Sequence, residues 1–158
     1  MNKKLFLLCG VPGSGKSTWA ANQLAANGDG IIISRDEVRF SIIKDDEEYF
    51  SHEDEVFKTW IEKINTAIKI APVSNIYVDA THISRGSRYK TLSNLKLDKV
   101  DIIPVWFNMS VTTCLDRNDN RTGRAFVPKS VIRRMTEQAQ APSHGEVFKY
   151  KDIIEVAE

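Results

Sequence analysis

Short apolar runs alternate with longer amphipathic stretches along this chain of 158 residues. A short apolar run between turn residues is typical of a buried strand, whereas apolar residues three and four positions apart are typical of a helix with one buried face. Strands that alternate with helices predict the α/β class, with a parallel sheet of about five strands and helices on both of its faces. The five runs that predict strands are KLFLLC (4–9), GIIIS (30–34), SNIYVDA (74–80), VDIIPVWFN (100–108) and KDIIEVA (151–157).

Helical patterns separate these runs, at residues 16–27, 52–71, 110–121 and 128–141. No repeat, linker or low-complexity segment interrupts them, and the length suits one folding unit, so we expect a single domain over residues 1–158. In an open parallel sheet, ligands bind beyond the carboxyl ends of the strands. The residues that follow each strand are therefore the candidates for a functional site.

The first strand is followed by GVPGSGKS (10–17), which fits the pattern Gly-x-x-x-x-Gly-Lys-Ser. Glycines in this pattern let backbone N–H groups approach phosphate oxygens, and the helix that follows adds the positive end of its dipole. Lys16 would reach the β- and γ-phosphates of a nucleoside triphosphate, and the Ser17 hydroxyl would ligate magnesium. The alternative is a flexible glycine turn, which the flanking strand and helix disfavour. We predict an ATP and Mg²⁺ site that contains Gly13, Ser14, Gly15, Lys16, Ser17 and Thr18.

The second strand is followed by SRDEVRF (34–40), in which Asp36 and Arg39 are three residues apart on the first turn of a helix. This spacing puts both side chains on one side of the turn. In phosphoryl transfer to a hydroxyl, a carboxylate can take the proton as the nucleophile attacks, and Arg39 would hold an anionic part of the acceptor. The alternative is that Asp36 caps the helix and Arg39 pairs with an acid.

The third strand ends at Asp79, where nucleotide sites carry a carboxylate that acts on magnesium through a bound water. Thr81 follows at a position that would contact the substrate or the metal ligands. Arg85 and Arg88 recur at helical spacing on one face, which suits either acceptor phosphates or solvent.

The fourth strand is followed by a helix end and a glycine-containing loop that carry Arg117, Arg121 and Arg124. Negative charge on a transferring phosphoryl group must be neutralised from several sides, and arginines on a closing loop do this while they exclude water. The three arginines favour a lid over about 117–127, and a solvated face is the alternative.

The overall charge is close to neutral, at +1, which by itself predicts no affinity for nucleic acid. The charges are unevenly distributed, because residues 44–55 are strongly acidic whereas residues 81–96 contain basic side chains and no carboxylate. A local basic surface on a neutral protein and an ordinary solvated face both fit this pattern.

The N-terminal segment MNKKLFLLCG has two lysines before an apolar run, as a secretion signal does. The run is shorter than the roughly 7–15 apolar residues that such a signal needs, so we interpret it as the first strand. No other segment is apolar enough to span a membrane. The two cysteines, Cys9 and Cys114, form no disulfide framework, and together with a triphosphate substrate they favour the cytoplasm.

Four segments in order resemble the 5′-kinase domain of bacteriophage polynucleotide kinase, within the P-loop kinases, from Lys4 to about Met135. They are PGSGKSTWA (12–20), SRDEVRFSII (34–43), THISRGSR (81–88) and RNDNRTGRAFVPKSVIRRM (117–135). The resemblance implies a kinase that transfers the γ-phosphate of ATP, with Mg²⁺, to the 5′-hydroxyl of DNA or RNA. Repair of RNA ends in a phage-infected cell fits it.

The family's roles carry over only to matching positions. The resemblance implies that Lys16 and Ser17 bind phosphate and magnesium, and that Asp36 is the general base. It further implies that Arg39 contacts an acceptor phosphate, that Thr81 lines the substrate tunnel, and that Arg117 and Arg121 are lid arginines. The sequence departs from the family at His82 and Arg35, where asparagines are usual, and it contains neither the phosphatase motif Asp-x-Asp-x-Thr nor the ligase motif Lys-x-Asp-Gly.

Two other functions remain open on the sequence. The same chemistry suits a kinase of a small alcohol, such as a sugar, nucleoside or antibiotic, because Asp-x-x-Arg after the second strand also occurs there. A non-catalytic nucleotide-binding switch is the third, although a switch needs neither Asp36 nor the lid arginines. The sequence leaves a homo-oligomer open.

Overall fold

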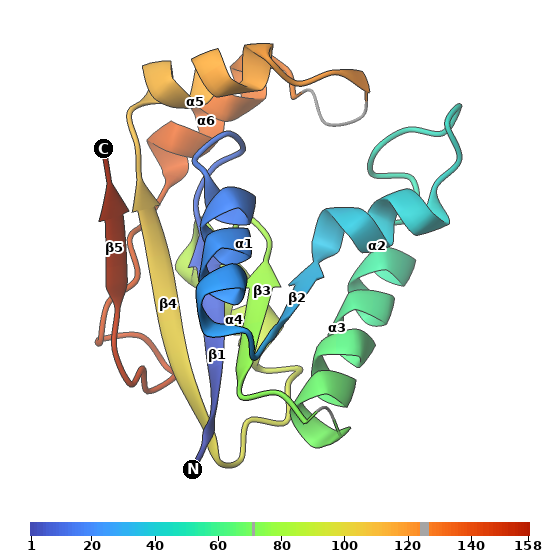
Figure 1. The fold of residues 1–158 in the computed structure, drawn as a ribbon. Coiled ribbons are helices and arrows are strands. Elements are labelled where there is room, and N and C mark those ends of the chain that lie inside the picture. The colour runs from blue at the N-terminus through green and yellow to red at the C-terminus, as the bar shows by residue number, and fades with distance from the viewer. Residues whose placement is uncertain (71, 124–126) are drawn as a thin grey trace.

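The computed structural model describes residues 1–70, 72–123 and 127–158, and it has an α/β fold (Figure 1). Five parallel strands form one sheet in the order β2-β3-β1-β4-β5. The strands are β1 (Lys3–Cys9), β2 (Ile31–Ser34), β3 (Asn75–Asp79), β4 (Val100–Asn108) and β5 (Ile154–Ala157). The helices are α1 (Lys16–Asn27), α2 (Arg35–Ile42), α3 (Glu53–Ile70), α4 (Arg85–Leu92), α5 (Val111–Asp119) and α6 (Lys129–Gln138).

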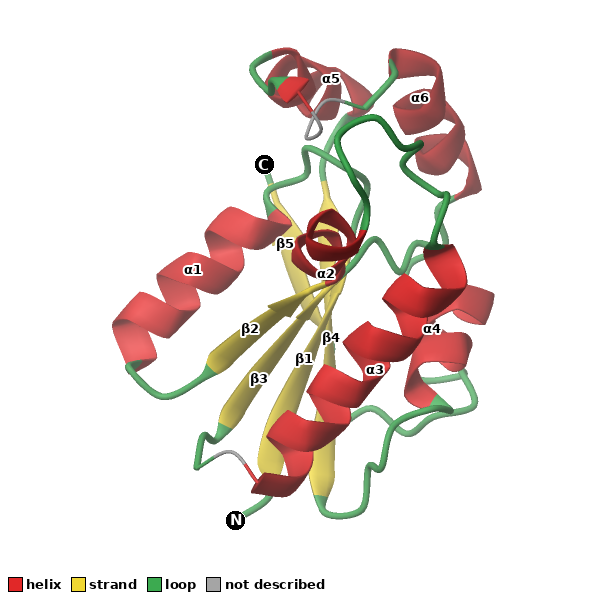
Figure 2. Cartoon of the chain, turned by 90° about the vertical axis from the view of Figure 1, so that its right-hand side faces the viewer, coloured by secondary structure: helices red, strands yellow, loops and turns green. Residues whose placement is uncertain are grey.

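Helices cover both faces of the sheet, as the sequence predicts. Figure 2 shows α1 on one side of the strands and α3 and α4 on the other. On the α3 side, Trp60 and Ile64 of α3 pack against buried strand residues such as Leu5 and Ile76. On the α1 side, Ala20 joins a smaller buried cluster with the strands. The α/β prediction is therefore confirmed.

The middle of the sheet positions the site. β1 lies between β3 and β4, with Leu7 beside Val78 of β3 and Pro104 of β4. The chain must leave β1 at the edge where the carboxyl ends of its neighbours also end, because all the strands are parallel. The loop after β1, α2, α5 and α6 all lie at that edge, toward the top of Figure 1.

The predicted element bounds agree closely for the central strands and less well elsewhere. The prediction 100–108 matches β4 at both ends, whereas β5 begins at Ile154 and not at 151. For α4, the only signal in the sequence is the helical spacing of Arg85 and Arg88. Within the described part of the chain, no helix has the length and apolarity needed to cross a membrane.

Candidate active site

The loop between β1 and α1 has a backbone shape that two glycines make possible. Gly13 and Gly15 have φ angles of +84° and +96°, in the left-handed region that side chains rarely adopt. A Cβ on Gly13 would lie 2.5 Å from the carbonyl oxygen of Cys114, and backbone atoms there cannot move aside. No described side chain caps α1 at Gly15, so the first N–H groups of the helix are left for an anion.

Within the described residues, one buried polar group of this loop lacks a hydrogen-bond partner, and a second donates only to carbonyl oxygens of the loop itself. Ser14 is fully buried, and its Oγ has no hydrogen-bond partner among the residues that the structure describes. Lys16 Nζ donates to the carbonyl oxygens of Gly10, at 2.9 Å, and Val11, at 3.1 Å. Burial lowers the pKa of Lys16, although the charge of Asp79 opposes this effect. The loop therefore fits the phosphates of a nucleotide.

Ser17 and Asp79 form the candidate magnesium site. The Ser17 hydroxyl, in the first turn of α1, donates to Asp79 Oδ2 at 2.8 Å, because β1 and β3 are neighbours. Mg²⁺ prefers oxygen ligands and usually takes one or two of them from protein and the rest from water and phosphate. Among the described residues no group of three or more metal-ligating side chains occurs. The pair fits a magnesium ion that phosphates and water also hold.

The structure describes two of the three predicted lid arginines, Arg117 and Arg121. Arg117, near the end of α5, donates from Nη1 to the carbonyl oxygen of Gly13 at 3.4 Å, so it lies against the phosphate loop. Arg121 lines the cavity beyond the strands. Arg124 lies outside the described residues.

Asn118 joins the two ends of the segment that we predict as a lid. Its Nδ2 donates to the carbonyl oxygen of Val127 at 2.6 Å, and the Val127 N–H donates back to Asn118 Oδ1 at 2.9 Å. Asn118 is fully buried, so these bonds are shielded from water. The side chain therefore fixes where the segment after α5 returns to the body of the protein.

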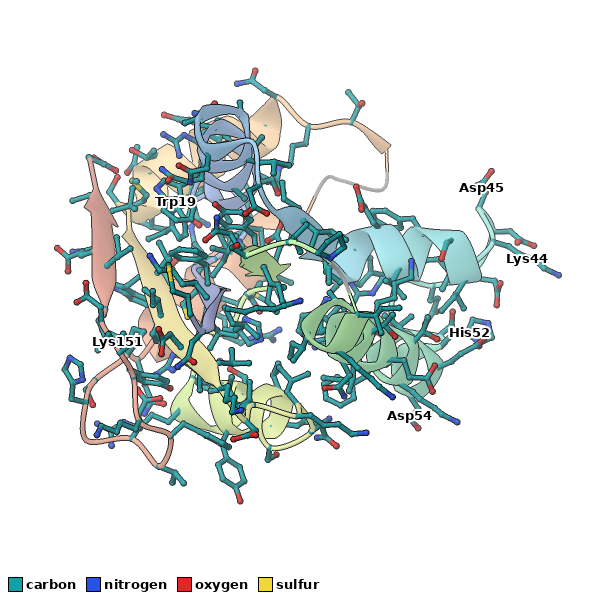
Figure 3. All side chains as sticks on the ribbon, turned by 60° about the horizontal axis from the view of Figure 1, so that its bottom comes forward. Trp19, Lys44, Asp45, His52, Asp54 and Lys151 are labelled. Carbon is teal, nitrogen blue, oxygen red and sulfur yellow. The ribbon has the colours of Figure 1, made fainter. Side chains whose placement is uncertain are left out.

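A cavity of about 620 Å³ opens at the carboxyl ends of β1, β2 and β3. Lys16, Ser17 and Asp79 are part of its lining, and most of the other lining residues come from α2, α6 and the loop after α2. Asp45 belongs to that loop, and Figure 3 shows Lys44 and Asp45 on the outer side of the molecule. The cavity thus connects the phosphate loop with the segment after the second strand.

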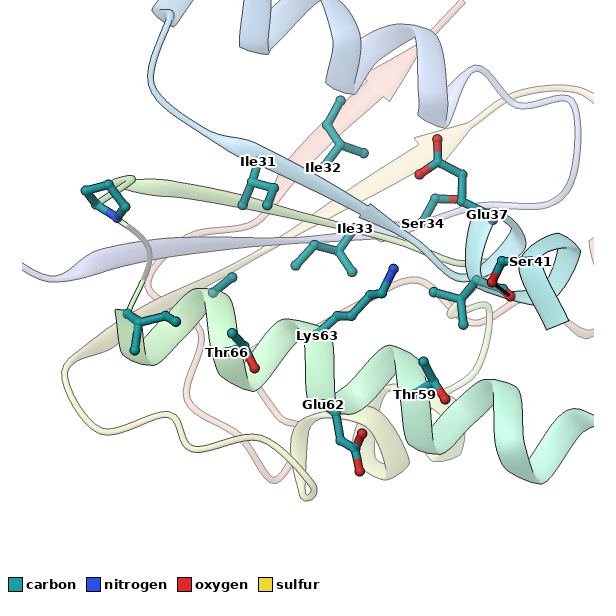
Figure 4. A pocket seen from close by; sticks show the side chains of 14 residues that line it. Ile31, Ile32, Ile33, Ser34, Glu37, Ser41, Thr59, Glu62, Lys63 and Thr66 are labelled. Carbon is teal, nitrogen blue, oxygen red and sulfur yellow. Dashed lines mark hydrogen bonds between the residues drawn. The ribbon is translucent and has the colours of Figure 1, made fainter.

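A second, larger hollow of about 730 Å³ lies beside β2, between α2 and α3. Its lining is largely aliphatic, and Figure 4 shows Lys63 extending from α3 toward β2. It contains none of the phosphate-loop residues. The smaller cavity is therefore the candidate active site.

Asp36 and Arg39 both line the active-site cavity, as their spacing predicts. Ser34 caps α2, because its hydroxyl accepts a hydrogen bond from Glu37 N–H at 3.2 Å, so Asp36 is not needed as a cap. Arg39 does pair with acids. Its Nε and Nη2 donate to both carboxylate oxygens of Glu53, and its Nη1 donates to Asp36.

The Arg39 guanidinium is held in its charged form. Burial opposes the charge, but the hydrogen bonds to Glu53 and the nearby charges outweigh it, and the pKa of Arg39 is raised. Arg39 is only 4% exposed, whereas the Asp36 side chain is 55% exposed. The carboxylate of Asp36 is therefore accessible to an acceptor, and its orientation is fixed from the protein side.

Thr81 lines the cavity, but the two arginines after it do not. Arg88 is fully buried, and its guanidinium donates to both oxygens of Glu146, at 2.9 and 3.0 Å, and to the carbonyl oxygen of His82. The prediction that Arg88 binds acceptor phosphate is therefore wrong, because its charge is already neutralised inside the protein. Arg85 is exposed on α4, away from the cavity lining, with Nη2 3.5 Å from Ser143 Oγ.

Glu53, Tyr49 and Asn118 are site residues that were not predicted from the sequence. Glu53 and Tyr49 both line the cavity, yet they belong to the strongly acidic segment 44–55, where nothing in the spacing distinguishes them. Asn118 is part of the segment RNDNR, so the motif contained it without showing what it binds. A partly exposed carboxylate opposite a buried arginine becomes recognisable only when α2 and α3 are placed together.

The model of the AAA domain family matches residues 5–142, which is most of the chain, and the protein belongs to this family. The matched segment includes the phosphate loop, the Asp36–Arg39 turn and the predicted lid. Its fold is that of a P-loop kinase.

Solved structures of several kinases are similar. A chain of the Pnkp1/Rnl/Hen1 RNA repair complex is 28% identical, with a TM-score of 0.74; the match covers 87% of this chain and 44% of that one. A gluconokinase from Sinorhizobium meliloti 1021 is 21% identical, with coverage of 98% and 82% and a TM-score of 0.61. A fungal RNA kinase is 14% identical, with coverage of 98% and 73% and a TM-score of 0.69. The present chain spans less than half of the RNA repair chain, and the two more distant similarities show the fold alone.

Proposed function

We propose that this protein is an ATP-dependent kinase that transfers the γ-phosphate to the 5′-hydroxyl of DNA or RNA. The observation that supports this most is one cavity that joins a phosphate loop to an exposed carboxylate beside a buried arginine. A chain of an RNA repair complex is the 28% identical relative, which favours a nucleic-acid acceptor.

Each residue has a distinct part in this proposal. Lys16 and the N–H groups of the loop bind the β- and γ-phosphates, and Ser17, with Asp79 through water, would hold Mg²⁺. Asp36 accepts the proton of the acceptor hydroxyl as its oxygen attacks. ATP supplies the phosphoryl group, and a magnesium ion held there would neutralise part of its charge.

The arginines stabilise charge and position the acceptor. Arg117 and Arg121, with Arg124 on the same segment, balance the charge on the phosphoryl group in the transition state. Arg39 binds the phosphate that follows the acceptor nucleoside, and Thr81 lines the same cavity. An enzyme that uses ATP and has two free, buried cysteines fits the cytoplasm.

A kinase of a small alcohol is the second candidate, and the similarity to a gluconokinase over 98% of the chain favours it. The two functions share the phosphate loop and Asp36 and differ in the acceptor. A nucleic-acid acceptor brings phosphates to Arg39, whereas a neutral alcohol brings none.

The deciding experiment is transfer of labelled γ-phosphate to 5′-hydroxyl oligonucleotides of DNA and RNA and to a panel of small alcohols. We expect transfer to at least one oligonucleotide, and Lys16→Ala should lower it by roughly two or three powers of ten while the fold is kept. Transfer to small alcohols alone would replace the polynucleotide proposal with the second candidate. Normal transfer by a folded Lys16→Ala protein would contradict the nucleotide site itself.

A further inference from the structure

Asn118 lies in the last turn of α5, and its side chain is bonded to the backbone of a single distant residue. Its Nδ2 donates to the carbonyl oxygen of Val127, and the Val127 N–H donates to its Oδ1. The amide thus pairs with Val127 as a residue of a neighbouring strand would. Asn118 is fully buried, so the loss of these bonds would leave polar groups without water to replace them.

Both ends of this link are connected to the active-site cavity. The Arg121 N–H donates to the backbone carbonyl oxygen of Asn118 at 2.9 Å, and Arg121 and Val127 both line the cavity. Val127 packs against a buried cluster that includes Cys114 of α5 and Ile132 of α6. Asn118 therefore connects the backbone that carries Arg121 to a fixed point of the protein.

The Arg121 guanidinium lies where a transferring phosphoryl group would need it. Burial lowers the pKa of Lys16, and the nearby positive charge of Arg121 lowers it further, so the two cations are close to each other. Arg121 follows the end of α5, so helical hydrogen bonds do not fix its backbone. Arg117, in contrast, belongs to α5 and has its own contact with Gly13. The position of Arg121 therefore depends on the bonds at the base of its turn.

We propose that Asn118 is a positioning residue for phosphoryl transfer, which holds the Arg121 guanidinium at the phosphate loop. The inference rests on the proposed function, because it takes Arg121 as a group that balances charge in the transition state. Such a group is effective when it is in place before the reaction, and a loosely held guanidinium must first be ordered. Asn118 itself is buried and does not line the cavity, so it acts through Arg121.

A double-mutant cycle between Asn118→Ala and Arg121→Ala tests this. We expect Asn118→Ala to lower kcat roughly ten- to hundredfold, the effect of a misplaced catalytic group, and to change the dissociation constant of ATP by less than about threefold. In the Arg121→Ala protein there is no guanidinium to position, so Asn118→Ala should lower kcat further by less than about twofold. A role in folding alone predicts the same relative loss of kcat in both backgrounds, because independent effects add as free energies.

Asn75→Ala is the matched control, because it removes an amide bond of the same kind far from the cavity. Asn75 is the first residue of β3, and its Nδ2 donates to the carbonyl oxygen of Asp29 at 2.8 Å. This variant should keep the kcat of the wild type. Denaturant unfolding of every variant gives the conditions under which all of them are folded. If Asn118→Ala does not fold, Asn118→Ser replaces it, since a serine side chain is too short to bridge both groups of Val127.

The outcomes separate this inference from the proposed function. Equal relative losses of kcat in the two backgrounds, or wild-type kcat in Asn118→Ala, overturn the role of Asn118. If the wild type phosphorylates no acceptor, the proposed function fails, and the same cycle is measured on the binding of ADP with aluminium fluoride, which mimics a transferring phosphoryl group. A loss of that binding in Asn118→Ala that disappears in the Arg121→Ala background supports the role of Asn118. A loss of equal size in both backgrounds, or no loss, overturns it.

Discussion

Among the described residues, Arg39–Glu53 and Arg88–Glu146 are bidentate arginine–glutamate pairs with the same chemistry and different surroundings. Arg39–Glu53 lines the active-site cavity, and Glu53 is partly exposed. Arg88–Glu146 is buried on both sides and ties α4 to the loop before β5. Of these two arginines, only Arg39 also donates a hydrogen bond to a candidate catalytic residue, Asp36. A bidentate bond to glutamate therefore does not distinguish a candidate site arginine from a structural one. The other groups around the arginine make this distinction.

The two surroundings also predict different consequences of substitution. A pair that borders a cavity can exchange partners with a ligand, so its loss should affect activity more than folding. A fully buried pair cannot, and its loss leaves an uncompensated charge inside the protein. The predictions below test this division, from the largest expected effect to the smallest.

Among these predictions, Asp36→Asn should have the largest effect. It changes the carboxylate that contacts Arg39 of the cavity pair, and we expect it to lower activity. A carboxylate that accepts the acceptor proton matters mainly in the transition state, so the turnover number should fall by about two to four powers of ten with little change in ATP affinity. Steady-state kinetics and ATP binding measure both. Glu37→Gln, the next residue on α2, points away from the cavity and serves as the control. Unchanged turnover in Asp36→Asn would mean that another group is the base.

Arg88→Met should have the second largest effect, on folding. It leaves Glu146 buried without its partner, which should lower the free energy of unfolding by about 3–5 kcal/mol, as measured by denaturant unfolding. Arg85→Met, three residues earlier and exposed, should change it by less than about 0.5 kcal/mol. The acceptor KM of folded Arg88→Met protein should match that of the wild type. A raised KM for phosphorylated acceptors alone would return Arg88 to the binding site.

Arg39→Ala should have a smaller effect that depends on the acceptor. The loss of a charge-assisted contact should weaken binding of the transition state, as calculated from kcat/KM. We expect the loss to be about 1–3 kcal/mol larger for a nucleoside 3′-phosphate than for the same nucleoside. Competition between the two acceptors in one reaction measures this difference directly. Equal losses on both acceptors would mean that Arg39 only orients Asp36.

The smallest effect is the pH dependence of the Arg88–Glu146 pair. Burial raises the pKa of Glu146, but its hydrogen bonds to Arg88, Ser143 and Tyr150 outweigh this, and the net pKa is lowered from 4.5. A carboxyl group whose pKa is lower in the folded state than in the unfolded state stabilises the folded state at any pH above its unfolded-state pKa. This stabilisation is lost as the pH falls through its folded-state pKa. The difference in unfolding free energy between wild type and Glu146→Gln should therefore be constant above about pH 5 and shrink below 4.5.

If the difference in unfolding free energy between wild type and Glu146→Gln stays constant below pH 4.5, Glu146 has the same pKa in the folded and unfolded states. His82 is also expected to weaken the fold in acid, because burial lowers its pKa to about 3. It is present in both proteins, so the comparison removes its contribution.

Local patterns predicted the elements well where apolar residues were frequent and poorly where they were not. The helix α4 has mostly polar residues, RGSRYKTL, so its apolar periodicity is weak and only its Ser84 cap and packing define it. The prediction starts β5 three residues too early because Ile153 lengthens the apolar run, although pairing with β4 begins only at Ile154. Pairing with β4, and not the local pattern, sets that boundary.

The sequence by itself determined the phosphate loop, because its glycines, lysine and serine are consecutive and their geometry follows from one turn between a strand and a helix. It also determined the Asp36–Arg39 spacing, since one helical turn fixes it. Only the tertiary structure decided which of Arg39 and Arg88 borders the cavity and which is buried away from it. Glu146 reaches Arg88 across 58 positions of the chain, and Glu53 reaches Arg39 from another helix. Charges are neutralised by whatever lies near them in space, and distance along the chain carries no information about that.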